Sequence, residues 1–424
     1  MADTQTNTAA NKSWLSRLGP GLVTGAADDD PSGVATYSQA GAQFGYGMLW
    51  TLLFTFPLMA AIQTIAARIG RVTGHGLATN IRRHFPRAVL YAIVGLLLIA
   101  NTINIAADIA AMGDALKLVI GGSAHLYAIG FGLLSVVLQV FIPYRRYVRV
   151  LKWLTLALLA YVATVFVIRI PWGELLSRAI LPPMLPWRAE YVTTLVAVFG
   201  TTISPYLFFW QASQEVEELH ADPAAHALKH APREARADFA RIQIDTYAGM
   251  GASNLVAFFI VLTTAVTLHG QGLHNIETSA QAASALRPVA GEFAFLLFSI
   301  GIIGTGLLAI PVLAGSAAYA TAGAFKWKNS LEDTPRMAPR FYAIIAVSTL
   351  GGAAFVFLPI DPFKALYWSA VINGVAAVPI MAIMMVLATR ASVMGKLTIP
   401  KGLKRMGWAC TAVMALAAVA MAVV

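Results

Sequence analysis

Three adjacent carboxylates interrupt the first apolar stretch of the sequence. Asp28, Asp29 and Asp30 precede Pro31, and Gly33 follows two residues later. Proline lacks an amide hydrogen and disfavours helical geometry at the residue before it, so a helix through this stretch should break near Asp30. A break exposes backbone carbonyls, and carbonyl oxygens beside a carboxylate suit hard divalent cations such as Mg²⁺ and Mn²⁺. The sequence therefore predicts a cation site at this break.

The composition indicates that the break lies inside a membrane. The 424 residues are 58% hydrophobic and 12% charged, whereas a soluble protein carries about 25% charged residues. A membrane-spanning helix needs roughly 20 mainly apolar residues. Eleven such stretches are present, at residues 19–38, 46–66, 88–111, 124–142, 150–168, 191–212, 246–268, 293–325, 341–360, 365–389 and 406–424. We therefore expect an all-α integral membrane protein with about 11 transmembrane helices.

Carboxylates are rare within these stretches, which makes them functional candidates. An aspartate at the centre of a membrane helix costs several kcal/mol, and besides the three at residues 28–30 the sequence has Asp108. The three could instead lie at the lipid headgroups and cap a helix. That alternative is disfavoured because neither residues 14–27 nor residues 34–46 can cross a membrane alone.

The basic residues predict the orientation. Alternate loops on the N-terminal side carry 24 of the 30 Lys and Arg residues, and the opposite side carries 6. Because cytoplasmic loops are enriched in Lys and Arg, we expect a cytoplasmic N-terminus and, with an odd number of spans, an external C-terminus in the plasma membrane. The net charge of +10 is spread over six segments, which excludes a nucleic-acid-binding module.

A second interruption matches the first. Pro205 lies near the middle of the sixth apolar stretch and follows the small polar residues 200–204. The first and sixth stretches are the corresponding first helices of two five-helix halves that face opposite ways. Paired broken helices in inverted repeats are typical of the central site of a secondary transporter.

Several ordered stretches resemble the NRAMP family of divalent-metal transporters. They are Gly19-Pro20-Gly21, Asp30-Pro31, residues 39–46 and residues 67–74. The resemblance implies a leucine-transporter-type fold with a 5+5 inverted repeat, broken first and sixth helices, alternating access, and transported metal with no cofactor. It divides the chain into a cytoplasmic tail (1–17), a first repeat (18–170), a second repeat (171–390), and a cytoplasmic loop with the eleventh helix (391–424).

The same resemblance implies a ligand set, and the sequence departs from the family pattern within it. Gly33 replaces an asparagine, Ser204 a methionine and Tyr206 a histidine, while Ala377 stands where a glutamine is usual. Asn373, one turn before Ala377, is an alternative ligand. The implied metal-site residues are Asp30, the carbonyl-bearing Ala27 and Thr201, Gly33, Ser204, Asn373 and Asp29, with Asp108 and Tyr206 as candidates for coupling to protons.

These departures favour a hard, hydrated ion. A thioether favours transition metals over Mg²⁺, so its replacement by Ser204 removes that preference, and Mg²⁺ usually retains several waters. The sequence resembles the magnesium and manganese branch related to the family. We expect Mg²⁺ and Mn²⁺ uptake, with weak or absent proton coupling because the pKa of tyrosine lies too high for a proton relay.

Other functions remain open from the sequence. They are proton-coupled Mn²⁺ or Fe²⁺ transport as in ordinary family members, transport of an organic cation or amine on the same fold, and a non-transporting sensor or scaffold. An enzyme is not expected, because no catalytic constellation and no ATP-binding P-loop is found and the single cysteine, Cys410, allows no thiol pair. No obligate protein partner is evident; the expected partners are the metal ion and the lipid bilayer.

Overall fold

The described part of the chain is built from helices. The computed structural model describes residues 20–142, 146, 153–173, 175, 177, 188–222 and 224–424, and every regular element in these ranges is helical. The expected tail of residues 1–17 lies outside the described residues. The all-α class is confirmed.

The helices follow the order expected from the apolar stretches. In the first half they are α1 (Pro20–Asp28), α2 (Pro31–Phe44), α3 (Leu49–Thr73), α4 (Leu77–His84), α5 (Arg87–Ile120), α6 (Ala124–Phe141) and α8 (Leu159–Val167). In the second half they are α10 (Ala189–Thr202), α11 (Pro205–Ala221), α12 (Ala235–Thr267), α13 (Ser279–Ser284), α14 (Arg287–Ala290), α15 (Ala294–Phe325), α16 (Pro339–Ala354), α17 (Pro362–Thr389), α18 (Ala391–Met394) and α19 (Lys401–Val423).

The length and apolarity of the helices make this a multi-pass membrane protein. Nine helical units in the described residues are long and apolar enough to cross a membrane. One of them, Pro31–Thr73, joins α2 and α3 through a short 3₁₀ turn and covers the predicted stretch 46–66 and residues 31–38 of the first. Leu156–Val167 is a shorter apolar helix within the predicted stretch 150–168. Each of the eleven predicted stretches thus overlaps one or two helices of the described chain.

Both predicted helix breaks are present. α1 ends at Asp28, and Asp30 is extended (φ −71°, ψ 170°) before Pro31 opens α2. α10 ends at Thr202, and Ser204 is extended (φ −80°, ψ 129°) before Pro205 opens α11. Proline favours this arrangement because it suits the first turn of a helix and disfavours helical geometry at the preceding residue.

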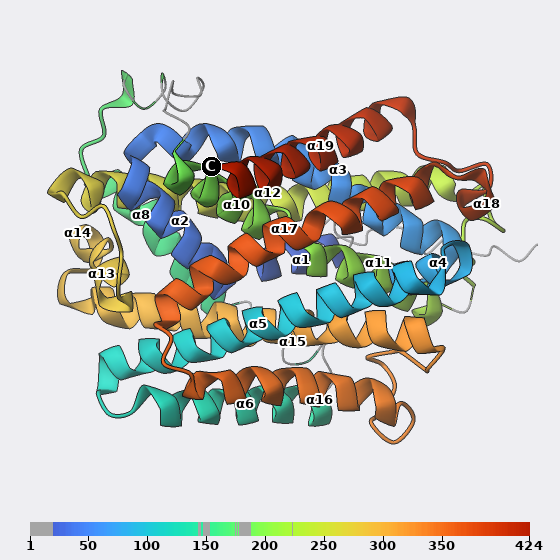
Figure 1. The fold of residues 1–424 in the computed structure, drawn as a ribbon, viewed down its shortest axis with the longest axis horizontal. Helices are drawn as coiled ribbons and strands as arrows, with labels where there is room; N and C mark the ends of the chain where they lie inside the picture. Colours follow the sequence, from blue (N-terminus) through green and yellow to red (C-terminus); the bar gives the residue numbers. More distant parts are fainter. Residues whose placement is uncertain are drawn as a thin grey trace, which may run out of the picture.

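Close helix contacts hold the broken segments in place. Gly25 of α1 lies against the backbone of Gly249 in α12, and Gly200 of α10 lies against Gly374 in α17, so a Cβ atom at Gly25 or Gly200 would collide with backbone. Small residues let membrane helices approach in this way. Figure 1 shows α6 and α16 at one edge of the bundle and α3 with α19 at the opposite edge, with α1 and α11 between them. The broken helices therefore lie in the interior.

Candidate metal site at the paired helix breaks

The carboxylate of Asp30 lies at the N-terminus of α2 and is held by three donors. Its Oδ1 atom accepts hydrogen bonds from the Gly33 amide and the Ser32 hydroxyl, both at 2.7 Å. Its Oδ2 atom accepts one from Nδ2 of Asn104 in α5 at 2.9 Å. Only 2% of the residue is exposed. The break therefore places one oriented carboxylate in the centre of the bundle.

A serine of α17 fixes the orientation of the Asn104 amide. The Ser369 hydroxyl donates to Oδ1 of Asn104 at 2.7 Å, which leaves the amide NH₂ group facing Asp30. This chain of contacts joins α2, α5 and α17. The sequence gives no signal for this pairing, because Asn104 and Ser369 are 265 residues apart and lie on different helices.

The two predicted carbonyl ligands each accept a hydroxyl from the second broken helix. Tyr206 of α11 donates to the Ala27 carbonyl at 3.1 Å, and Ser204 donates to the Thr201 carbonyl at 2.9 Å. A carbonyl oxygen has two lone pairs, so each keeps one position for an ion. The Tyr206 hydroxyl therefore joins the second broken helix to the first at the Ala27 carbonyl.

Gly33 supplies space and a donor. Its amide is directed at Asp30, and a Cβ atom built on Gly33 would lie 3.1 Å from Oγ1 of Thr201, 3.4 Å from the Asp28 carbonyl and 3.4 Å from Oδ1 of Asp30. Three oxygens from both breaks therefore surround this glycine. A side chain in its place would require the Thr201 hydroxyl to shift by a few tenths of an ångström.

The other two aspartates of the first break are turned toward α12. Oδ2 of Asp28 and Oδ1 of Asp29 lie 2.8 and 2.9 Å from the Ser253 hydroxyl, and both residues are buried. The contact with Ser253, which the sequence did not predict, separates them from the donors that hold Asp30. The structure thus separates Asp30 from Asp28 and Asp29, which share the Ser253 hydroxyl.

Asp108 and Asn373 are buried polar residues one turn from the Asn104–Ser369 pair. Asp108 follows Asn104 by four residues in α5, and Asn373 follows Ser369 by four in α17, so each lies on the same helix face as its bonded neighbour. Within the described residues, neither side chain has a hydrogen-bond partner. The described chain also contains no group of three or more His, Cys, Asp or Glu side chains that could hold a metal. The available ligands are the Asp30 carboxylate and neutral oxygens, with the Asp108 carboxylate one turn along α5 from Asn104.

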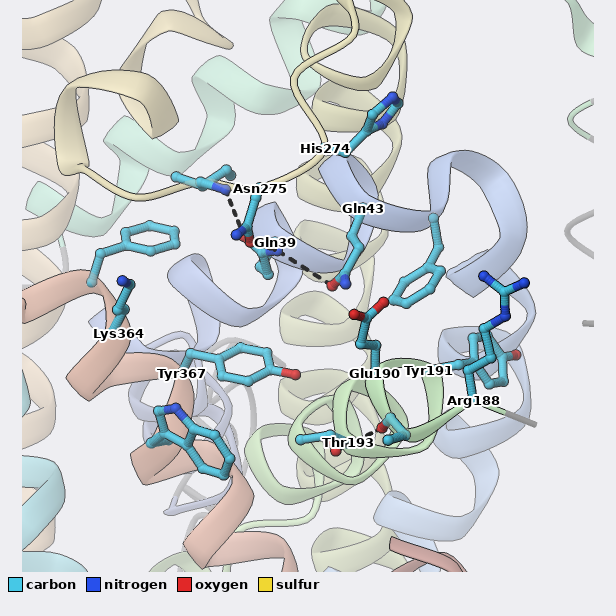
Figure 2. A pocket seen from close by; sticks show the side chains of 15 residues that line it. Gln39, Gln43, Arg188, Glu190, Tyr191, Thr193, His274, Asn275, Lys364 and Tyr367 are labelled. Carbon is cyan, nitrogen blue, oxygen red and sulfur yellow. Dashed lines mark hydrogen bonds between the residues drawn. The ribbon is translucent and has the colours of Figure 1, made fainter. Parts of the chain in front are cut away.

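A cavity lies between the outer ends of α2, α10 and α17, on the side predicted to be external. Its volume is about 760 Å³, and Gln39, Gln43, Tyr367 and Asn275 are among the residues that line it (Figure 2). Gln39 donates to Asn275 at 2.9 Å, which ties α2 to the loop after α12. Nine residues separate Asp30 from Gln39, which corresponds to roughly 13 Å along a helix. We call this cavity the outer vestibule.

Comparison with known proteins agrees with this geometry. The profile of the family described as "Natural resistance-associated macrophage protein-like" (Nramp) matches residues 21–424. The chain belongs to the Nramp family. The resemblance seen in the sequence is confirmed, and membership of a transporter family agrees with the expectation of a protein that is not an enzyme.

Individual relatives cover nearly the whole chain. A protein named divalent metal cation transporter MntH, from Klebsiella pneumoniae, is 27% identical over 412 residues, which are 96% of this chain and 93% of that protein. A manganese transporter of Eremococcus coleocola superposes with a TM-score of 0.75 at 16% identity, covering 96% of this chain and 87% of the other. Mhp1, a nucleobase-cation-symport-1 family transporter, superposes with a TM-score of 0.58 at 14% identity, covering 96% and 91%. These likenesses establish the Nramp fold and the leucine-transporter-type class.

Proposed function

We propose that this protein moves Mg²⁺ and Mn²⁺ into the cytoplasm by alternating access, with the ion partly hydrated and held at Asp30. The observation that carries the proposal is the oriented Asp30 carboxylate between two helix breaks that each present a backbone carbonyl. Such a set of oxygens suits hard divalent cations. Membership of the Nramp family supports divalent-metal transport, as do the names of the Klebsiella and Eremococcus relatives.

The predicted ligands favour an ion that keeps part of its water. The proposed ligands are the carboxylate of Asp30 and the carbonyl oxygens of Ala27 and Thr201. Ser204 has a hydroxyl at the position where the family pattern has methionine, whose thioether favours transition metals. We propose that water molecules complete the coordination shell of the ion. This suits Mg²⁺, because Mg²⁺ loses its bound water reluctantly. The hydroxyls of Ser204 and Tyr206 each use one lone pair of these carbonyls, and the second lone pair of each is open to an ion or to its waters. Asn373 is close in sequence to the position of the missing glutamine, and we keep it as a candidate ligand.

Proton coupling is not part of the proposal. Tyr206, which stands where the family pattern has a histidine, donates its hydroxyl to the Ala27 carbonyl. A phenol does not exchange protons readily near neutral pH, as an imidazole does. Uptake would be driven by the ion gradient and by the membrane potential, which contributes about 4.6 kcal/mol for a divalent ion per 100 mV.

The decisive experiment is reconstitution in liposomes. Fluorescent dyes inside the vesicles report Mg²⁺, Mn²⁺ and pH while the ion is added outside under an inside-negative potential. We expect Mg²⁺ and Mn²⁺ to enter without acidification of the lumen. Acidification in step with metal entry would refute the uncoupled mechanism, and uptake of an amine without metal would favour an organic-cation transporter.

A further inference from the structure

Two histidines converge at the rim of the outer vestibule. His269 lies two residues after the last residue of α12, Thr267, and His274 lies five residues later in the same loop. Their Nδ1 atoms are 3.1 Å apart, and Nδ1 of His269 lies 2.8 Å from the carbonyl oxygen of Ala42, near the C-terminus of α2. His274 is exposed and lines the vestibule (Figure 2). None of these residues contributes to the site at Asp30.

A single hydrogen on Nδ1 of His269 cannot form full hydrogen bonds to both the Ala42 carbonyl oxygen and Nδ1 of His274. A carbonyl oxygen only accepts hydrogen bonds, and an imidazole nitrogen either donates or accepts. If Nδ1 of His269 is protonated, its one hydrogen must serve both the Ala42 carbonyl and His274. If it is not protonated, it can accept from His274, but it then faces the Ala42 carbonyl with no hydrogen between them. A cation bound to all three atoms would use each of them as an acceptor.

The spacing fits neighbouring ligands of one transition-metal ion. Metal–nitrogen distances near 2.0–2.1 Å place adjacent ligand atoms roughly 2.9 to 3.4 Å apart in octahedral and tetrahedral geometry. The Nδ1–Nδ1 distance of 3.1 Å lies in this range. The ring of His269 is also pre-positioned, because it packs against Gly45, whose positive φ of 56° and missing side chain leave room for it. The C-terminal end of a helix favours a cation there as well.

We propose that His269, His274 and the Ala42 carbonyl form an external site for a late transition-metal ion such as Zn²⁺ or Ni²⁺, separate from the transport site. Imidazole ligands favour these ions over Mg²⁺. A bound ion would join the end of α2 to the loop after α12, the same junction that Gln39 makes through Asn275 and the amide of Ile276. If α2 moves during the transport cycle, a point that rests on the proposed function, the ion would slow Mg²⁺ uptake.

Binding can be measured without transport. Ni²⁺ is titrated calorimetrically into the purified full-length protein, free of any affinity tag, in excess Mg²⁺ so that the central site is occupied. We expect His274→Gln to weaken Ni²⁺ binding about tenfold or more, which corresponds to about 1.4 kcal/mol. His125→Gln, an exposed histidine at the start of α6, is the matched control and should bind as the wild type does. No binding by the wild type, or unchanged binding by both His269→Gln and His274→Gln, would overturn the proposal.

The consequence for transport is a second, independent readout. Zn²⁺ added outside liposomes should slow Mg²⁺ uptake by the wild type and have little effect on uptake by His274→Gln. Because His274 is exposed, we expect this variant to fold normally, and an unchanged melting temperature checks this. Equal inhibition of both proteins would overturn the regulatory role. If no Mg²⁺ enters the liposomes at all, the proposed function fails, and the Ni²⁺ titration still decides the site.

Discussion

The Nδ2 atom of Asn104 lies 2.9 Å from Oδ2 of Asp30 and joins the third membrane helix to the break in the first. Ser369 of α17 fixes the orientation of this amide. A side chain that resembles an ordinary packing residue thus orients the carboxylate at the centre of the proposed transport site.

Substitution of Asn104 by alanine tests this role. Asp30 loses a donor and Ser369 loses an acceptor, and a hydrogen bond to a charged group contributes about 1.5–3 kcal/mol. We expect Asn104→Ala to weaken Mg²⁺ binding by roughly 10- to 100-fold in calorimetric titrations. Asn101→Ala is the matched control, because Asn101 bonds the Leu313 carbonyl and Ser316 instead of Asp30. Equal loss of affinity in both variants would contradict a specific role for Asn104.

Ser204 tests the origin of ion preference. Its hydroxyl donates to the Gly200 and Thr201 carbonyls, so Ser204→Met frees two carbonyls and adds a thioether. We expect the ratio of Mn²⁺ to Mg²⁺ uptake in liposomes to rise several-fold, because thioethers favour transition metals. Ser204→Leu has a similar size without sulfur and should leave the ratio nearly unchanged. A similar shift in both variants would point to size and not to ligand chemistry.

The contact between α10 and α17 should be sensitive to one methyl group. A Cβ atom at Gly200 would collide with the backbone of Ala370 and Gly374, so Gly200→Ala should lower the melting temperature and the yield of folded protein. Gly95→Ala is the control, since nothing lies within 4 Å of a Cβ at that position. Alanine in a helix interior is more stable than glycine by about 0.5–1 kcal/mol. A Gly200→Ala protein that melts at the same temperature as the wild type would show that α10 and α17 can move apart at a low cost in free energy.

An ion pair with one fully buried partner should stabilise the end of α11. Arg241 of α12 lies 2.5 Å from Oε2 of Glu215, whose side chain is fully buried. Removing one partner of a buried pair costs about 3–5 kcal/mol, because the other charge stays uncompensated. Arg241→Gln should therefore melt at clearly lower temperature in detergent. Arg236→Gln removes an exposed charge of the same helix and should melt close to the wild type, and equal melting of both variants would argue against the ion pair.

The broken helices could be predicted from the sequence because their causes are local. Pro31 and Pro205 favour an extended conformation at the residue before them, Asp30 and Ser204, and this effect does not depend on how neighbouring helices pack. The lengths of the apolar stretches indicate the number of membrane spans. The family resemblance added the positions of Ala27 and Thr201. Their metal-binding role stays a prediction.

The contacts between distant helices could not be predicted in the same way. Asn104 and Ser369 are 265 residues apart, and Ser253 is more than 220 residues from Asp28 and Asp29. The local sequence pattern does not predict which faces of two distant helices contact each other. The pairing of His269 and His274 also depends on a loop conformation, although their spacing of five residues offered a weak signal.

Anomalous scattering from crystals grown with Mn²⁺ tests the central claim most directly, because it places the ion without reference to activity. The account predicts a peak at coordination distance from the Asp30 carboxylate, between the Ala27 and Thr201 carbonyls, that disappears in Asp30→Ala. An ordered Mn²⁺ in the membrane interior that excludes Asp30 from its ligands, or one that persists unchanged in Asp30→Ala, would contradict it.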